Sequence, residues 1–188
     1  MSSSPACAHD AEKVARVNGV RIAHETLGDP KAPPLLVMGL GLPLIYWDRA
    51  FCQLLVDAGF YVIRFDNRDS GRSSRIEDGP TPSLAALVSA YHGHMSAWHG
   101  YTLDDMADDA AALLDRLGVG RVHAVGISLG GMIAQQLAVR HPALVLSLAS
   151  IMSTTGERRV SRPRPRAAAA LLSRAPRERE AYAAVAPR

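Results

Sequence analysis

A serine between glycines is the strongest chemical signal in the sequence. Gly126-Ile127-Ser128-Leu129-Gly130 fits the pattern G-x-S-x-G, and another glycine follows directly. An apolar stretch precedes the pattern and an amphipathic stretch follows it, which predicts a strand, a sharp turn and a helix. Glycines two residues away on either side avoid clashes in such a turn. We therefore predict that Ser128 is an exposed nucleophile and that Gly126 and Gly130 shape the turn; the alternative is a glycine-rich turn with an incidental serine.

Two backbone amides are candidates for stabilising negative charge on a substrate oxygen. The first N–H groups of a helix lack partners within it, so the amide of Leu129, directly after the serine, is one donor. Leu40 is the other, in the glycine-rich stretch 38–41 that follows the apolar run Leu35–Met38. Such a loop can also be a plain tight turn. Together with the serine pattern, it predicts an oxyanion hole made by Leu40 and Leu129.

Short strands and helices alternate around this pattern. Asn18-Gly19 predicts a two-residue hairpin turn between strands at 13–17 and 20–27. Further strands are expected at 35–38, 61–65, 121–125 and 144–151, and helices at 103–117 and 129–140, with another that has Trp47, Phe51, Leu54 and Leu55 on one face and ends near Gly59. This alternation predicts an α/β fold, with a mostly parallel sheet and helices on both faces.

The stretch after residue 101 has the clearest helix signals. Thr102 is predicted to cap the helix with its hydroxyl, Asp105 follows three residues later, and Gly118 ends the helix. The polar residues Asp66, Arg68 and Asp69 follow the strand at 61–65, and we interpret them as a salt-bridged turn that supports the rim of the sheet.

Composition is typical of one globular domain, or of the main part of a larger one. The 188 residues are 48% hydrophobic and 21% charged with a net charge of +3, which excludes a disordered chain. Cys7 and Cys52 are too few for a disulfide scaffold, and residues 1–10 have no secretory signal pattern, so we expect a cytoplasmic protein. The stretch 121–140 lacks formal charges apart from its ends, but its glycines, serine and glutamines argue against a membrane span.

The positive charge belongs to the end of the chain. Residues 157–188 hold nine Arg and three Glu, a balance of +6, whereas the other 156 residues have a balance of −3. Nucleic-acid binding favours basic residues interleaved with aromatic ones, and this segment offers only Tyr182. We therefore expect neither a nucleic acid nor a membrane as partner.

Five segments in order resemble the N-terminal part of the α/β-hydrolase family, over residues 13–156, and are similar to bacterial esterases of the aclacinomycin methylesterase type. They are VMGLG at 37–41, VIRFDNRDSGRSS at 62–74, YTLDDMADDAAALLDRLGV at 101–119, VGISLGGMIAQ at 125–135 and SIMSTTG at 150–156. The resemblance implies a serine hydrolase that cleaves a small-molecule carboxylic ester through an acyl-enzyme on Ser128, with Leu40 and Leu129 as oxyanion-hole amides. It also implies three parts: a disordered tail at 1–11, the N-terminal part of the core at 12–156, and an Arg/Pro-rich linker with the start of a helical cap at 157–188.

One part of the family's pattern is missing. The family's catalytic residues follow in the order Ser, then Asp or Glu, then His. After Ser128 there is no Asp, and the only acids are Glu157, Glu178 and Glu180. The only His is His141, which we interpret as a helix terminator before Pro142. We therefore expect a truncated member that lacks its acid and its His, most of the cap and the last strands. The strand at 144–151 would then be an open sheet edge and a site of self-association.

Other activities remain as alternatives. A non-catalytic remnant or binding module would keep the fold without the reaction, and a perhydrolase or haloperoxidase-like activity fits the same scaffold. Gly39, Gly41 and Asp66 resemble a dinucleotide fingerprint, but Leu44 replaces its third glycine. His92, His94 and His99 could bind zinc, but no neighbouring carboxylate or cysteine joins them, so we interpret them as solvated loop residues. We predict no cofactor and no metal.

Overall fold

The computed structural model describes residues 12–32, 34–37, 43–76 and 100–157. The chain divides into two units, residues 1–154 and 155–188, and almost all described residues belong to the first. The expected tail at 1–11 and nearly all of the expected linker and cap at 157–188 lie outside the described residues. These two interpretations therefore stay predictions.

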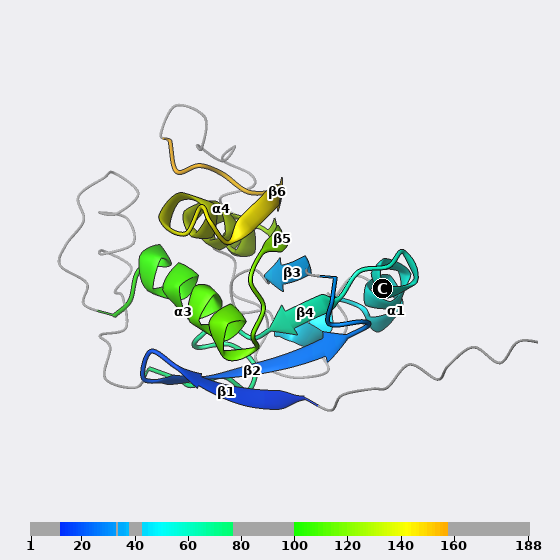
Figure 1. The fold of residues 1–188 in the computed structure, drawn as a ribbon. Helices are drawn as coiled ribbons and strands as arrows, with labels where there is room; N and C mark the ends of the chain where they lie inside the picture. The colour runs from blue at the N-terminus through cyan, green and yellow to red at the C-terminus, as the bar shows by residue number, and fades with distance from the viewer. Residues whose placement is uncertain (1–11, 33, 38–42, 77–99, 158–188) are drawn as a thin grey trace, which may run out of the picture. The chain divides into compact units, whose positions relative to one another are not determined.

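The described strands form one sheet in the order β1-β2-β4-β3-β5-β6 (Figure 1). Their bounds are β1 Lys13–Val17, β2 Val20–Leu27, β3 Pro34–Val37, β4 Val62–Phe65, β5 Val122–Ile127 and β6 Val145–Ile151. β2 runs antiparallel to both of its neighbours, whereas β4, β3, β5 and β6 are parallel. Because β6 lies last in this order, it forms an edge of the described sheet, as the sequence predicts; pairing of this edge with another chain stays a prediction.

The first two strands meet in the predicted hairpin. Asn18 and Gly19 both have positive φ, +46° and +79°, and the register pairs Val17 with Val20. Two consecutive left-handed residues make the turn whose twist matches that of the flanking strands, and Asn-Gly is the dipeptide that tolerates it best. The local sequence thus determines this hairpin.

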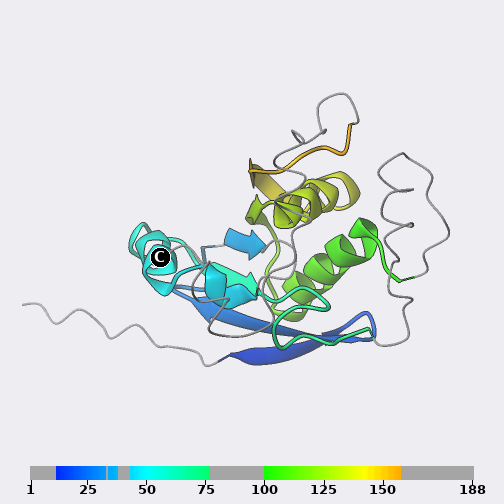
Figure 2. The same ribbon diagram turned by 180° about the vertical axis from the view of Figure 1, so that it is seen from behind.

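Helices cover both faces of the sheet. They are α1 Arg49–Asp57, α3 Leu103–Arg116 and α4 Leu129–Arg140, with a short 3-10 turn, η1, at Leu44–Tyr46. α3 and α4 lie side by side in both views, while α1 lies away from them (Figures 1 and 2). In the described part of the chain, no helix combines the length and the apolar character that a membrane crossing requires.

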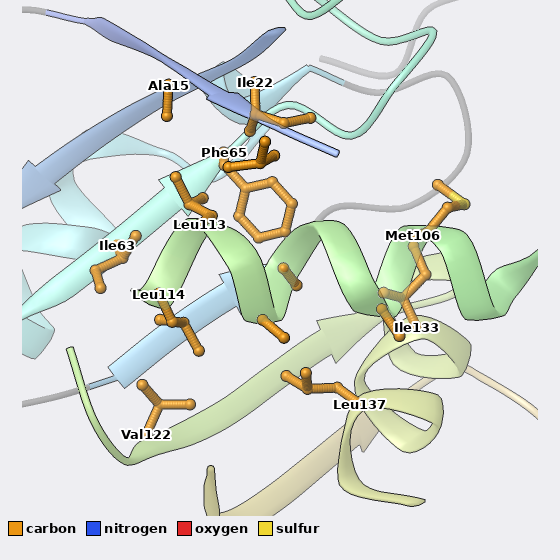
Figure 3. Packing of buried hydrophobic residues seen from close by; sticks show 14 of the residues in the cluster. Ala15, Ile22, Ile63, Phe65, Met106, Leu113, Leu114, Val122, Ile133 and Leu137 are labelled. Carbon is orange, nitrogen blue, oxygen red and sulfur yellow. The ribbon is translucent and has the colours of Figure 1, made fainter. Parts of the chain in front are cut away.

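The buried apolar residues form two clusters, and neighbouring residues of one strand belong to different clusters. Ile63 and Phe65 on β4 pack with Leu113 on α3 and with α4 (Figure 3). Val62, one residue from Ile63, packs instead with Cys52 on α1. Since successive strand residues point to opposite faces, the two clusters lie on opposite faces of the sheet, which confirms the predicted layers.

The helices α1 and α3 differ in how well the sequence predicts them. The side chain of Thr102 accepts the amide of Asp105, and Asp105 in turn accepts that of Thr102, so the predicted cap forms a full capping box. For α1, the predicted face is correct only in part: Trp47 and Leu55 pack in the cluster around Cys52, whereas Phe51 and Leu54 are exposed. Asp48 caps the helix, so Trp47 lies before its start, where its ring stacks on that of Phe51 with centroids 5.6 Å apart.

The turn after β4 is structural, as expected, but its ion pair reaches another element. Arg68 binds Asp109 on α3 through two contacts of 2.8 Å. Asn18 from the hairpin donates to the same carboxylate at 3.1 Å, and the guanidinium lies 5.1 Å from the centre of the Tyr101 ring. This cluster therefore ties the hairpin, the turn and α3 together.

A second ion pair is buried under η1. Arg64 on β4 donates to Oε2 of Glu25 on β2 at 2.6 and 3.1 Å, with side chains only 4% and 12% exposed. The same guanidinium donates to the carbonyl oxygens of Trp47 and Leu44. Arg64 therefore joins two strands to the segment that leads into α1.

Replacing Arg64 tests this junction. Arg64→Met leaves the largely buried Glu25 carboxylate with the ion pair to Arg49, whose guanidinium lies 3.8 Å away and is half-exposed, so we expect the free energy of unfolding to fall by about 3 kcal/mol. The double variant Glu25→Leu/Arg64→Met should recover much of this loss in urea unfolding. As a control, Arg72→Met breaks an exposed pair with Glu12 and should cost under about 0.5 kcal/mol. Equal losses in the two single variants would contradict the assignment.

The buried His24 predicts a dependence of stability on pH. Its side chain lies on β2, and within the described residues its Nε2 atom has no hydrogen-bond partner. Burial lowers its pKa, the Ile22 carbonyl opposes this shift, and the charge of Lys13 adds to it. The unfolded chain therefore binds a proton near pH 6.5 that the folded chain does not, so the contribution of His24 to stability falls as the pH drops below that value. We expect unfolding free energies measured from pH 7.5 to 5 to fall less steeply for His24→Leu than for the wild type; parallel curves would contradict this role.

Candidate active site

Ser128 lies in a sharp turn between β5 and α4. Its φ and ψ are +55° and −121°, its side chain is exposed, and its amide donates to the carbonyl oxygen of Ile151 on β6 at 2.9 Å. A positive φ in a non-glycine residue costs roughly 1–3 kcal/mol and persists only where the surroundings fix it. The predicted turn is thus present, at the end of the sheet where parallel strands present their carboxyl ends and where α/β folds bind ligands.

The absence of a side chain at Gly126 allows the turn to close. A Cβ there would lie 2.1 Å from the carbonyl oxygen of Gly130, closer than real atoms approach. Gly126 and Gly130 are both buried. These two glycines therefore let the first turn of α4 sit directly against β5, as the sequence pattern predicts.

A third glycine, Gly131, has a role that sequence reasoning missed. A Cβ on Gly131 would lie 2.6 Å from both Cβ and Oγ of Ser153 and 2.8 Å from Oγ of Ser150. Gly131 thus lets the residues after β6 approach the start of α4. The sequence signal is the glycine directly after the G-x-S-x-G pattern. Its contact partner, Ser153, lies 22 residues further along the chain and cannot be inferred from the local sequence.

The start of α4 can stabilise an anion. The carbonyl oxygen of Ser128 accepts the amides of Gly131 and Met132, at 3.0 and 3.3 Å, and so begins the helix. The amide of Leu129 belongs to the first helical residue, at the positive end of the helix dipole. This geometry suits the predicted donor. Leu40, the other predicted donor, lies outside the described residues, and the oxyanion-hole role of both stays a proposal.

Asp66 holds the segment that follows residues 38–42, and sequence reasoning missed this role. Its buried carboxylate accepts the amide of Leu44 at 2.5 Å and that of Arg72 at 2.8 Å. A Cβ on Gly71 would lie 2.0 Å from this carboxylate. Asp66 thus binds backbone amides, in contrast to the salt-bridged turn expected for it. Together with Arg64, it fixes η1 directly after the stretch that contains Leu40.

His141 and Ser128 lie at opposite ends of α4. Nε2 of His141 contacts Oδ1 of Asp108 on α3 at 2.7 Å, and Arg140 binds the same carboxylate. Arg140 and His141 lower the pKa of Asp108 to about 2. A helix of twelve residues is about 18 Å long, so the structure does not bring the two residues together. His141 thus ends the helix, as the sequence indicates.

The remaining predicted site residues cannot be placed. His92, His94, His99, Gly39 and Gly41 lie outside the described residues, so the zinc and dinucleotide alternatives are not tested by the structure. Among the residues that are described, no group of three His, Cys, Asp or Glu side chains could hold a metal ion.

The steric role of Gly126 predicts a strong effect of one methyl group. Gly126→Ala should lower the free energy of unfolding by about 3 kcal/mol, because the backbone of α4 must shift to admit the Cβ. Gly120→Ala is the matched control, since a Cβ there meets nothing within 4 Å and that glycine lacks a positive φ. Urea unfolding of both variants measures the difference. A Gly126→Ala variant as stable as Gly120→Ala would mean that the turn is looser than described.

Comparison with known proteins places this geometry in a family. Residues 34–178 match the alpha/beta hydrolase fold family. The chain is 41% identical over 130 residues to rhodomycin D methylesterase of Streptomyces peucetius, and 39% identical over the same length to that of Streptomyces sp. (strain C5). Each match covers 69% of this chain and 38% of the methylesterase, so the chain spans less than half the length of these relatives.

A solved structure agrees with this match. The enol-lactonase from Burkholderia xenovorans LB400 superposes with a TM-score of 0.55 at 27% identity, over 71% of this chain and 44% of the lactonase. A hydrolase from Pseudomonas aeruginosa PA01 superposes with a TM-score of 0.54 at 29% identity, over 71% of this chain and 43% of the hydrolase. Sequence and structure thus agree on the fold, and the methylesterases agree with the resemblance to bacterial esterases. The chain belongs to the alpha/beta hydrolase fold family.

Proposed function

We propose that this chain carries the nucleophile of a carboxylic-ester hydrolase, with Ser128 as that nucleophile. The Ser128 oxygen attacks the ester carbonyl carbon, and the Leu129 and Leu40 amides stabilise the negative charge that develops on the carbonyl oxygen. The alcohol leaves with a proton, and an acyl-enzyme remains on the Ser128 oxygen. Water then attacks the acyl carbon, releases the carboxylic acid and returns a proton to the serine.

The observation that carries this proposal is the backbone of Ser128. Ser128 has a φ of +55°, precedes the first residue of α4 and keeps its side chain exposed. Backbone strain of this kind clusters at active sites, which supports a use for the exposed hydroxyl. The two methylesterase relatives cleave methyl esters by their names, which supports a methyl ester of a small molecule as the substrate class. We propose no cofactor, because this chemistry needs none.

A base for the serine is the missing part of the proposed reaction. A serine hydroxyl is a weak nucleophile near neutral pH unless a base removes its proton. The only histidine after Ser128 in these 188 residues is His141, and its ring contacts the Asp108 carboxylate at the far end of α4. We therefore propose that the acid and the base come from sequence beyond these 188 residues.

A non-catalytic binding module is the alternative function. The position of His141 favours it, since the described residues bring no histidine that follows Ser128 close to the serine. A module of this kind would keep the turn and the fold but would not activate the hydroxyl. The two functions therefore differ in the reactivity of Ser128 alone.

Reaction with an alkyl fluorophosphonate separates these functions. We expect slow labelling of one serine, identified as Ser128 by peptide mass spectrometry and absent in Ser128→Ala. Ser150→Ala is the matched control, because it removes another exposed hydroxyl from the same end of the sheet. No labelling of the wild type above the Ser128→Ala level would refute the nucleophile and favour the binding module.

Turnover of p-nitrophenyl acetate tests the missing base. Loss of a catalytic triad member leaves only the contribution of the oxyanion hole and binding, so we expect a kcat about 10⁴-fold below that of a full-length methylesterase. Ser128→Ala should lower the remaining rate further. A rate equal to that of the full-length enzyme, lost in Ser128→Ala, would contradict the proposal that the base lies outside this chain.

A further inference from the structure

Met152 lies beside Ser128 at the end of the neighbouring strand. β5 and β6 are parallel, and their last paired residues are Ile127 and Ile151. Ser128 and Met152 each come one residue later, and the bond from the Ser128 amide to the Ile151 carbonyl continues the pairing to this point. Because adjacent strands lie about 4.8 Å apart, Met152 is a neighbour of the proposed nucleophile although 24 residues separate them.

The backbone of Met152 is in the left-handed region. Among the described non-glycine residues, those with positive φ are Asn18, Asp69, Ser128 and Met152, the last with φ of +46°. Asn and Asp tolerate this conformation, and the strain at Ser128 has a use in the proposed function. Met152 has a long apolar side chain and gains no such tolerance from it. Glycine at this position would avoid the strain altogether.

Contacts on both sides of Met152 hold this conformation. On one side, the carbonyl oxygen of Ile151 accepts the Ser128 amide. On the other, Ser153 packs in the space that a Cβ on Gly131 would fill, at 2.6 Å. The residues around the turn therefore fix the backbone of Met152 from both neighbours, which is the condition under which strain persists at functional sites.

The side chain of Met152 is 80% exposed, more than any other large apolar residue of the described chain. An unbranched thioether adapts its shape to an apolar ligand at little cost. An exposed apolar side chain, fixed by a strained backbone next to a nucleophile, is therefore suited to contact a substrate.

We infer that Met152 is a specificity-determining residue, which contacts an apolar group of the ester close to the carbonyl that Ser128 attacks. This inference rests on the proposed function. It names the substrate feature that the site selects: an alkyl or ring carbon group on the reacting carbonyl, in preference to a short or polar one.

Labelling by two probes tests this contact. Methyl and octyl fluorophosphonates react in the same way: the Ser128 oxygen bonds to phosphorus, the P–F bond breaks, and fluoride and the serine proton pass to solvent. Their rate ratio therefore reports recognition of the alkyl group. In Met152→Ala we expect the octyl-to-methyl ratio to fall about fivefold, because apolar contact with the chain is lost. Met152→Leu should keep the ratio within about twofold, because it retains apolar bulk.

Controls separate this contact from stability and from the proposed function. Leu146→Ala removes an exposed apolar side chain, 41% exposed, from the same strand but far from its end, and should leave the ratio unchanged. Met152→Gly should raise the midpoint of thermal unfolding, because the strain is relieved, and yet lower the ratio. An unchanged ratio in Met152→Ala and Met152→Gly, with labelling that still requires Ser128, would overturn the inference and leave the function intact. No labelling of the wild type would overturn both.

Discussion

The close contact between the start of α4 and the ends of β5 and β6 is the constraint on which the candidate site depends. Two positions without a Cβ make it possible: Gly126 faces the backbone of Gly130, and Gly131 faces Ser153. Once these backbones meet, the residue between strand and helix must turn within one step, which forces Ser128 into a positive φ. The exposed hydroxyl and the helix amides beside it are consequences of that packing, not separate features.

Polar groups of β4 and the turn after it fix the elements around this contact. Arg64 binds Glu25 and the backbone of η1, Asp66 binds the Leu44 amide, and Arg68 binds Asp109 on α3. Burying such groups is costly unless each is paired, so they add little net stability but penalise any arrangement in which the partners separate. If β4 held only apolar residues, it would pack equally well against the helices, but the position of η1 would be less strictly defined. Directional hydrogen bonds and ion pairs thus fix the elements that flank the site, whereas close packing of apolar side chains fixes the core.

The features that sequence predicts well are those whose cause lies within a few residues. Asn18-Gly19 specifies its hairpin, Thr102 and Asp105 specify a capping box, and the glycines around Ser128 specify the turn, each by local backbone geometry. Features that depend on distant partners were missed or wrong. The role of Gly131 depends on Ser153, that of Asp66 depends on Leu44, and the burial of Cys52 in place of Phe51 depends on how α1 packs against the sheet. Leu40 is predicted by a local pattern but lies outside the described residues, so its role rests on that pattern and on the family.

The parts of the site that the described residues supply are almost all made by the backbone. Glycines without side chains, two strained residues and the first amides of a helix need only the packing of β5, α4 and β6. Acid–base catalysis has a different requirement, because it needs side chains whose position depends on other elements. The backbone geometry of Ser128, the proposed nucleophile, can therefore form without the groups that would activate it. By the same reasoning, the backbone contacts of Ile151 and Ser153 fix Met152, so the substrate contact that we propose for Met152 does not depend on the base either.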